Sequence, residues 1–115
     1  PFDRVRTVGL GLPGVEAATK YDGSPVLKVG GAFMAGLATH PSAEAETLVV
    51  RSGFEQRELL LEDASDTYYV TDHYLKHPVV LARLSRLETE ALRDLLSMSW
   101  RLTMAKGRTR AEEDR

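Results

Sequence analysis

The residues best suited to chemistry lie in a polar loop in the second half of the chain, between the apolar runs Tyr68–Thr71 and Val79–Arg83. An imidazole can bind a metal, move a proton or carry a positive charge, while tyrosine and lysine can contact bases and phosphates. The loop combines these side chains and holds two of the three histidines of the chain: His73, Tyr74, Lys76 and His77. This composition suits metal binding, acid–base catalysis or nucleic-acid binding.

A metal site in this loop would use His73 and His77 with Asp72, since imidazole and carboxylate groups ligate zinc and iron. Two histidines four residues apart converge on a helix, but Pro78 and the flanking strand-like runs place this pair in a loop. The third histidine, His40, is distant in the sequence. We therefore expect no metal site and no cofactor.

A catalytic site is not indicated either. Ser65, Asp66 and His73 could be drawn as a triad, but the sequence has no nucleophile elbow and no glycine-rich phosphate loop. It also lacks paired carboxylates with a reason to be buried together, and Gly30-Gly31 favours a turn. We expect a protein that is not an enzyme.

Nucleic-acid binding could use tyrosine rings to stack on bases and cationic side chains to meet phosphates. The candidate residues are Lys28, Tyr69, His73, Tyr74, Lys76, His77, Arg83 and Arg101. Because Tyr68 and Tyr69 point to opposite faces of a strand, one of them is expected in the core. Arg83 and Arg101 have a structural alternative, which is to pack or to pair with acidic side chains.

The formal net charge of −2 differs from the basic excess that is usual in dedicated nucleic-acid binders. The local distribution is more informative. Residues 55–72 contain six acidic side chains and one basic side chain, whereas residues 73–87 contain Lys76, Arg83 and Arg86 and no acid. The charge therefore changes sign at the polar loop.

Two functions from different classes follow. The first is weak, salt-sensitive DNA binding through the hairpin from Tyr69 to Arg83, which needs a contiguous positive face. The alternative is a protein-interaction or adaptor role without nucleic-acid binding, which needs an exposed apolar patch. The expected partner is thus DNA or another protein, and the oligomeric state stays open.

Three stretches resemble the signature of the MmcQ/YjbR-like proteins. They are Leu12-Pro13-Gly14-Val15-Glu16, then Lys28-Val29-Gly30-Gly31, and finally Tyr68-Tyr69-Val70-Thr71-Asp72-His73-Tyr74 followed by Pro78 and Val80-Leu81-Ala82-Arg83-Leu84. The resemblance runs from Leu12 to Arg101 and implies a small bacterial DNA-binding domain related to the frataxin-like, double-wing fold. The sequence departs from the family at Ala32, where a lysine is common, and at Val79, where a tryptophan is frequent.

Hydrophobic periodicity predicts the elements that must position the loop. The first half begins with a helix that ends at Pro13-Gly14, followed by a strand of alternating residues from Val15 to Tyr21 and a turn at Asp22-Gly23. A hairpin follows, in which Gly30-Gly31 joins Val26–Val29 to Ala32–Leu37. The loop Thr39–Glu46 then leads to a strand, Thr47–Arg51. Ser52 and Glu55 have the spacing of a capping box, which predicts a helix that ends near Asp63–Asp66.

The clearest element is the last helix, whose apolar residues recur every three or four positions from Leu84 to Leu102. We expect about 15 to 18 residues lying across the sheet, beginning at a cap formed by Ser85 and Glu88 or one turn later. Residues 106–115 lack apolar periodicity and are expected to form a flexible charged tail.

Strands joined by short turns pair antiparallel, so the predicted class is α+β, with a twisted antiparallel sheet, helices packed on one face and a long C-terminal helix. The 115 residues suit one two-layer domain, residues 1–105. No apolar run approaches the roughly 20 residues that cross a bilayer. The lack of cysteine and of a signal-peptide layout predicts a bacterial cytoplasmic protein without a membrane partner.

Overall fold

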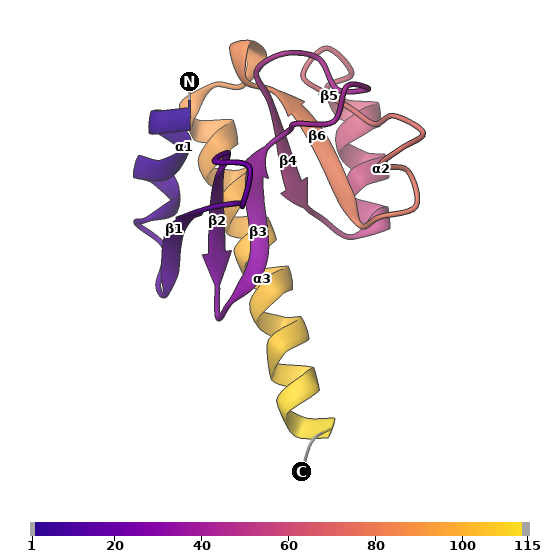
Figure 1. Cartoon of the computed structure of the whole chain (residues 1–115). Helices are drawn as coiled ribbons and strands as arrows, with labels where there is room; N and C mark the ends of the chain where they lie inside the picture. The colour runs from indigo at the N-terminus through magenta and orange to yellow at the C-terminus, as the bar shows by residue number, and fades with distance from the viewer. Residues whose placement is uncertain (1, 114–115) are drawn as a thin grey trace.

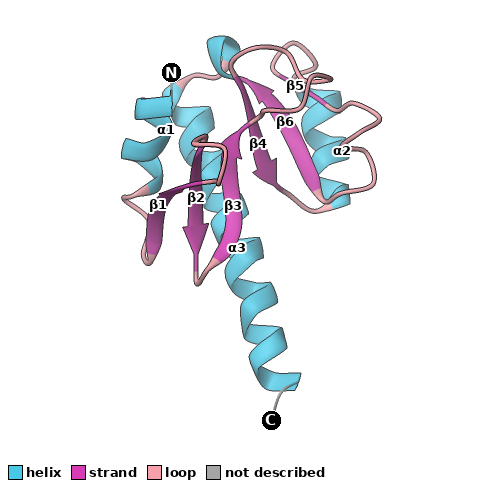
Figure 2. Cartoon of the chain, in the orientation of Figure 1, coloured by secondary structure: helices cyan, strands magenta, loops and turns pink. Residues whose placement is uncertain are grey.

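The computed structural model describes the backbone of residues 2–113 and the side chains of residues 2–106. Within these residues the chain forms a six-stranded antiparallel sheet in the spatial order β1-β2-β3-β4-β6-β5 (Figures 1 and 2). The strands are β1 (Val15–Thr19), β2 (Pro25–Val29), β3 (Ala32–Leu37), β4 (Thr47–Arg51), β5 (Tyr68–Tyr69) and β6 (Val79–Arg83).

The helices are α1 (Phe2–Gly9), α2 (Phe54–Asp63) and α3 (Thr89–Glu113), with a short 3₁₀ turn η1 (Leu84–Arg86) after β6. α3 packs against β2, β3 and β4, whereas α2 packs against β5 and β6, and α1 lies against α3 and β2. Figure 1 shows α3 behind the sheet, with its C-terminal half extending past the ends of the strands. The predicted α+β class, with its antiparallel sheet and long C-terminal helix, is confirmed.

The core lies between the helices and one face of the sheet. Leu27, Ala35, Val50 and Val80 stand in one cross-strand row and are fully buried on this side. Their helical neighbours include Leu92 and Leu96 of α3, which are also fully buried, and Leu95. In this layer the apolar side chains of the last helix, which recur every 3.6 residues, pack on the inward side chains of the strands, which recur every two residues.

No helix among the described residues covers the other face of the sheet, yet Val26, Val49 and Leu81 on that face are buried. The loop before β4 passes in front of part of this face (Figure 1). Gly36 contributes as well, because an added Cβ would approach the Phe33 ring to 3.1 Å. The missing side chain leaves room for the Phe33 ring against the sheet.

Gly9 likewise permits a close approach of two elements. It ends α1, where a glycine weakens a helix, but a Cβ at this position would overlap Cδ1 of Leu27. The absent side chain lets α1 approach β2 closely. Close to the same end of α1, Nε1 of Trp100 donates a hydrogen bond of 2.8 Å to the carbonyl oxygen of Pro13, which ties α3 to the chain just after α1.

Two predictions at the level of elements were wrong. The capping box at Ser52 does not form, because the N-cap of α2 is Gly53 and no side chain caps the helix. The backbone N–H of Ser52 instead donates to the Pro78 carbonyl, so Ser52 extends the pairing of β4 with β6 and lies one residue before the N-cap. In β1, the alternation does not reach Tyr21, which lies beyond the strand and is fully exposed.

The last helix begins at Thr89, one turn after the proposed cap at Ser85, and its 25 residues exceed the expected 15 to 18. The residues before it form η1. Helical backbone continues to Glu113 through most of the proposed tail, while the side chains from residue 107 onward and the last two residues lie outside the described part. Among the described residues, no helix has the length and apolarity needed to cross a bilayer.

Candidate nucleic-acid interface

Arg57 of α2 makes several hydrogen bonds that hold the loop between β5 and β6. Its side chain is buried although it carries a full charge. NH1 donates to the carbonyl oxygens of His77 at 2.9 Å and Val79 at 3.2 Å, and NH2 donates to that of Leu75 at 2.9 Å. The Phe54 ring lies 5.0 Å from its guanidinium carbon. Arg57 therefore fixes the backbone that carries the polar side chains of the loop.

The structure brings His40, which is distant in sequence, next to the loop. The rings of His40 and His73 stack with centroids 3.5 Å apart and an interplanar angle of 10°. The Tyr74 ring stands edge-on to His73 with a centroid distance of 4.8 Å. A hydrogen bond of 2.9 Å between the hydroxyls of Ser42 and Thr71 joins the same two loops. The loop before β4 thus supports the loop before β6.

Within the part of the chain that the structure describes, no group of three or more histidine, aspartate or glutamate side chains is arranged to hold a metal ion. His40 Nδ1 instead lies 2.8 Å from the hydroxyl of Ser42 and accepts the backbone N–H of the same residue at 3.0 Å. This local bonding orients the ring for stacking on His73.

The surroundings shift the pKa of both rings of the loop. Partial removal from water lowers the pKa of His73 below its ordinary value, and the nearby His40, His77 and Lys76 add to this effect. Burial raises the pKa of the Tyr74 hydroxyl. At neutral pH both groups are therefore neutral and present flat aromatic surfaces.

A cleft of about 310 Å³ opens on the face of the sheet that no described helix covers. Its walls come from β3, β4, the loop and the start of β6, and the lining residues are Phe33, Val49, Arg51, His73, Tyr74, His77, Pro78 and Val79. No acidic side chain lines it. Nε of Arg51 donates to the carbonyl oxygen of Phe33 at 2.9 Å, which holds this guanidinium at the wall of the cleft.

The remaining candidate cations differ in whether they lie on the same side of the sheet as this cleft. Lys28 is the cross-strand partner of Phe33 and therefore points to the same face of the sheet. Lys76 is exposed in the loop between His73 and His77. Arg101 is exposed on α3, on the opposite side of the sheet, so the structure separates it from the others.

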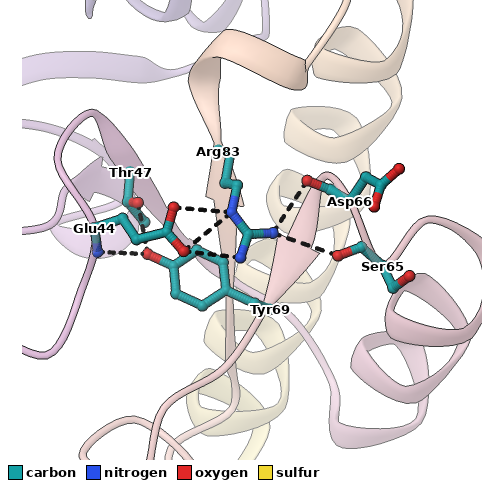
Figure 3. Close-up of polar contacts among 6 residues, drawn as sticks. All are labelled: Glu44, Thr47, Ser65, Asp66, Tyr69 and Arg83. Atoms are coloured by element: carbon teal, nitrogen blue, oxygen red, sulfur yellow. Dashed lines mark hydrogen bonds and ion pairs between the residues drawn. The ribbon is translucent and has the colours of Figure 1, made fainter.

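Tyr69 and Arg83 belong to a cluster of polar contacts between residues of the chain itself (Figure 3). Arg83 makes three hydrogen bonds to the Glu44 carboxylate, the shortest 2.8 Å, and donates to the carbonyl oxygens of Ser65 and Asp66. Its guanidinium also covers the Tyr69 ring at 4.3 Å. The pairing holds the pKa of the Glu44 carboxyl below its ordinary value.

The tyrosine hydroxyl completes this cluster. It lies 2.7 Å from the hydroxyl of Thr47 and accepts the backbone N–H of Glu44 at 2.8 Å. These contacts join the loop before β4 to β5 and β6, which gives Tyr69 and Arg83 a structural role. The structural alternative considered for Arg83 thus accounts for its position without a ligand.

Sequence reasoning missed three residues of the site: Phe33, His40 and Arg51. A signal for Arg51 existed, because the two-residue period of the strand Thr47–Arg51 places it on the same face as Val49. The hairpin from Val26 to Leu37 likewise pairs Lys28 with Phe33. For His40 no local pattern announces a contact made across two loops.

Comparison with known proteins gives one match. A scan against protein families matches residues 10–102 to the YjbR family, which is most of the chain. Searches of curated proteins and of solved structures each found no significant match. The matched segment spans the sheet, α2, the loop with its histidines and most of the packed part of α3. The chain therefore belongs to the YjbR family.

Proposed function

We propose that this protein binds DNA without catalysing a reaction, and that the cleft on the open face of the sheet is the contact surface. The observation that carries the proposal is the composition of that cleft, which combines an arginine, two histidines and two aromatic rings with no acidic side chain. Proteins that bind single strands use the same combination, in which cations meet phosphates and rings stack on bases. The resemblance to the MmcQ/YjbR-like proteins, which implies a small DNA-binding domain, also supports the proposal.

The geometry favours unpaired bases over duplex DNA. The rings of Phe33 and Tyr74 lie in a recess beside Arg51, where a base could enter but the edge of an intact duplex could not stack. Lys28, Arg51 and Lys76 provide about three phosphate contacts, so we expect micromolar or weaker affinity without strong sequence preference.

The direct test is a titration of labelled single-stranded and duplex DNA followed by fluorescence anisotropy. With three phosphates neutralised on a single strand, the affinity should fall roughly 20-fold between 50 and 200 mM salt. Arg51→Gln should weaken binding about fivefold or more through the loss of one charged contact. Arg101→Gln removes an exposed arginine on the other side of the sheet and should leave the affinity within about twofold of the native value.

A second variant tests the stacking surface. Phe33→Leu keeps an apolar side chain over Gly36 but removes the ring, and base stacking on an aromatic ring is worth about 1–3 kcal/mol. We expect the affinity for single strands to fall about fivefold or more, with an unchanged melting temperature as the check on folding.

The proposal fails if folded protein binds no form of DNA at 50 mM salt, or if Arg51→Gln and Arg101→Gln weaken binding equally. The alternative expectation, an interaction module that binds protein but no nucleic acid, would then lead. DNA binding also requires a compartment that contains DNA, which in a bacterium is the cytoplasm.

A further inference from the structure

A second open site lies on the helical side of the molecule, between α2 and α3. It exists because α2 packs on β5 and β6 while α3 packs on β2, β3 and β4, so the two helices cover different halves of the sheet. The groove left between them has a volume of about 470 Å³. Its apolar lining comes from Leu60, Tyr68, Leu87, Ala91, Leu95 and Met98.

The rim of this groove is acidic. Asp63 stands on the α2 side, and Glu88 and Asp94 stand on the α3 side, against one cation, Arg86. All three carboxylates are exposed, and within the described side chains none of them forms an ion pair. Three negative charges thus stand around an apolar floor with one cation among them, and none of the three is engaged in an ion pair within the described side chains.

Two neighbouring features extend this description. Burial raises the pKa of the Tyr68 hydroxyl at the floor, and the carboxylates of Asp63 and Asp94 raise it further, so the negative potential reaches into the groove. Leu59 is 64% exposed and lies one helical turn before Asp63. Its side chain adds apolar surface beside the acidic rim.

We propose that the groove between α2 and α3 binds a basic amphipathic segment of a partner protein. The apolar side chains of that segment would lie on the floor formed by Tyr68, Leu87 and Met98, and its lysines or arginines would lie among the three carboxylates. Such a pairing is the usual way in which an amphipathic helix occupies a groove. Charge complementarity selects this partner, because the acidic rim repels nucleic acid and anionic lipid alike.

This site is independent of the proposed DNA contact. The groove lies on the helical face of the sheet and contains three acids, whereas the cleft lies on the opposite face and contains none. One molecule could therefore hold a basic protein segment and a nucleic-acid strand at the same time.

The test uses two synthetic helical peptides of 14 residues with the same apolar pattern, one of leucine and lysine and one of leucine and glutamate. Binding to the isotopically labelled protein is followed by NMR, with the amide signals of Ala91 and Met98 reporting on the groove. We expect saturable binding of the lysine peptide with shifts at these residues, and no binding of the glutamate peptide.

Matched variants separate the groove from the general acidity of α2. The double variant Asp63→Asn/Asp94→Asn removes two rim charges and should weaken the lysine peptide about fivefold or more. The control Glu55→Gln/Glu58→Gln removes two exposed acids of α2 that do not line the groove, and it should change the affinity less than twofold. Ala91→Leu fills part of the groove and should also weaken binding.

Several results would overturn the proposal: no binding of the lysine peptide, equal binding of the glutamate peptide, or equal losses in the two double variants. Thermal unfolding of each variant shows whether a loss of binding reflects a loss of folding. Because the rim does not contact the cleft, the outcome is independent of whether the protein binds DNA.

Discussion

At the scale of single residues, the same side-chain type serves opposite purposes in this protein. Arg83 is bound by Glu44 and by two backbone carbonyl oxygens, and both terminal nitrogens of Arg57 donate to carbonyl oxygens of residues 75–79. Arg51 has only its Nε engaged among the described residues. Its free guanidinium nitrogens make it the arginine best placed to meet a ligand, although all three residues look equivalent in the sequence.

Arg57→Met tests the role of the buried arginine. The substitution keeps an unbranched side chain of similar length but leaves three carbonyl oxygens of the loop without their donor. Because a hydrogen bond to a charged group contributes about 1.5–3 kcal/mol and such contributions do not add fully, we expect a loss of about 3 kcal/mol in unfolding free energy. Urea denaturation measures this loss. Glu58→Met on the exposed side of α2 is the control and should change little.

The environment of His73 in the stacked imidazole pair predicts that folding stability depends on pH. The folded-state pKa of His73 is lowered, so above its ordinary value near 6.5 the ring is neutral in both states and has no effect on stability. As the pH falls through 6.5, the unfolded chain binds the proton first, and stability decreases until the pH reaches the lowered folded-state value.

We therefore expect the melting temperature to fall between pH 7 and pH 5 more in the native protein than in His73→Gln.

DNA binding should change with pH in the opposite direction. A nearby phosphate favours the charged ring, so binding should tighten as the pH falls from 8, mainly below 6.5. Equal pH profiles of native protein and variant, in both melting and binding, would rule out His73 as the titrating group.

At the scale of elements, α3 combines a packed half and a projecting half. Leu92, Leu95 and Leu96 are buried against the sheet, and Thr103 is the last buried residue among those whose side chains are described on the helix. Ala105 and Lys106 are exposed. The first half of the helix therefore supplies the core, as the spacing of its leucines predicts.

Leu95→Ala should reduce the unfolding free energy by about 2–5 kcal/mol, because it leaves a cavity under α3. Truncation after Met104 should leave the melting temperature within a few degrees of the native value, since the removed residues follow the buried part. Differential scanning calorimetry of both proteins, with Leu59→Ala as an exposed control, measures these effects. A large loss on truncation would mean that residues 105–115 contact the folded domain.

At the scale of the whole molecule, the two faces of the sheet carry sites of different charge. The net charge of −2 conceals this division, because the open face has an acid-free cleft while the helical face has a groove with an acidic rim. Association with an anion depends on the local field rather than on the total charge.

A pair of charge reversals distinguishes local from total charge. Lys76→Glu in the loop and Lys106→Glu on α3 change the net charge equally, and both side chains are exposed. If the cleft binds DNA, Lys76→Glu should weaken binding to every sequence alike by about tenfold, whereas Lys106→Glu should have an effect of about twofold or less. Anisotropy titrations at 50 mM salt give both values, and equal effects would mean that net charge alone governs binding.

The sequence by itself determined the elements and much of the candidate site. The strands Thr47–Arg51 and Val79–Arg83, the hairpin at Gly30-Gly31 and the apolar period of the last helix are local patterns, and local geometry is enough to read them. The site residues His73, Tyr74, Lys76 and His77 were likewise found because they are neighbours in one loop.

Only the tertiary structure decided which cations are free and which residues from elsewhere complete the site. The stacking of His40 on His73, the carbonyl cage around Arg57 and the pairing of Arg83 with Glu44 each join residues at least 18 positions apart. Gly9 shows the same limit, since a residue that weakens a helix also leaves the space that the Leu27 side chain fills. Such contacts depend on how the elements pack against one another, and the periodicity of apolar residues along the chain does not predict that packing.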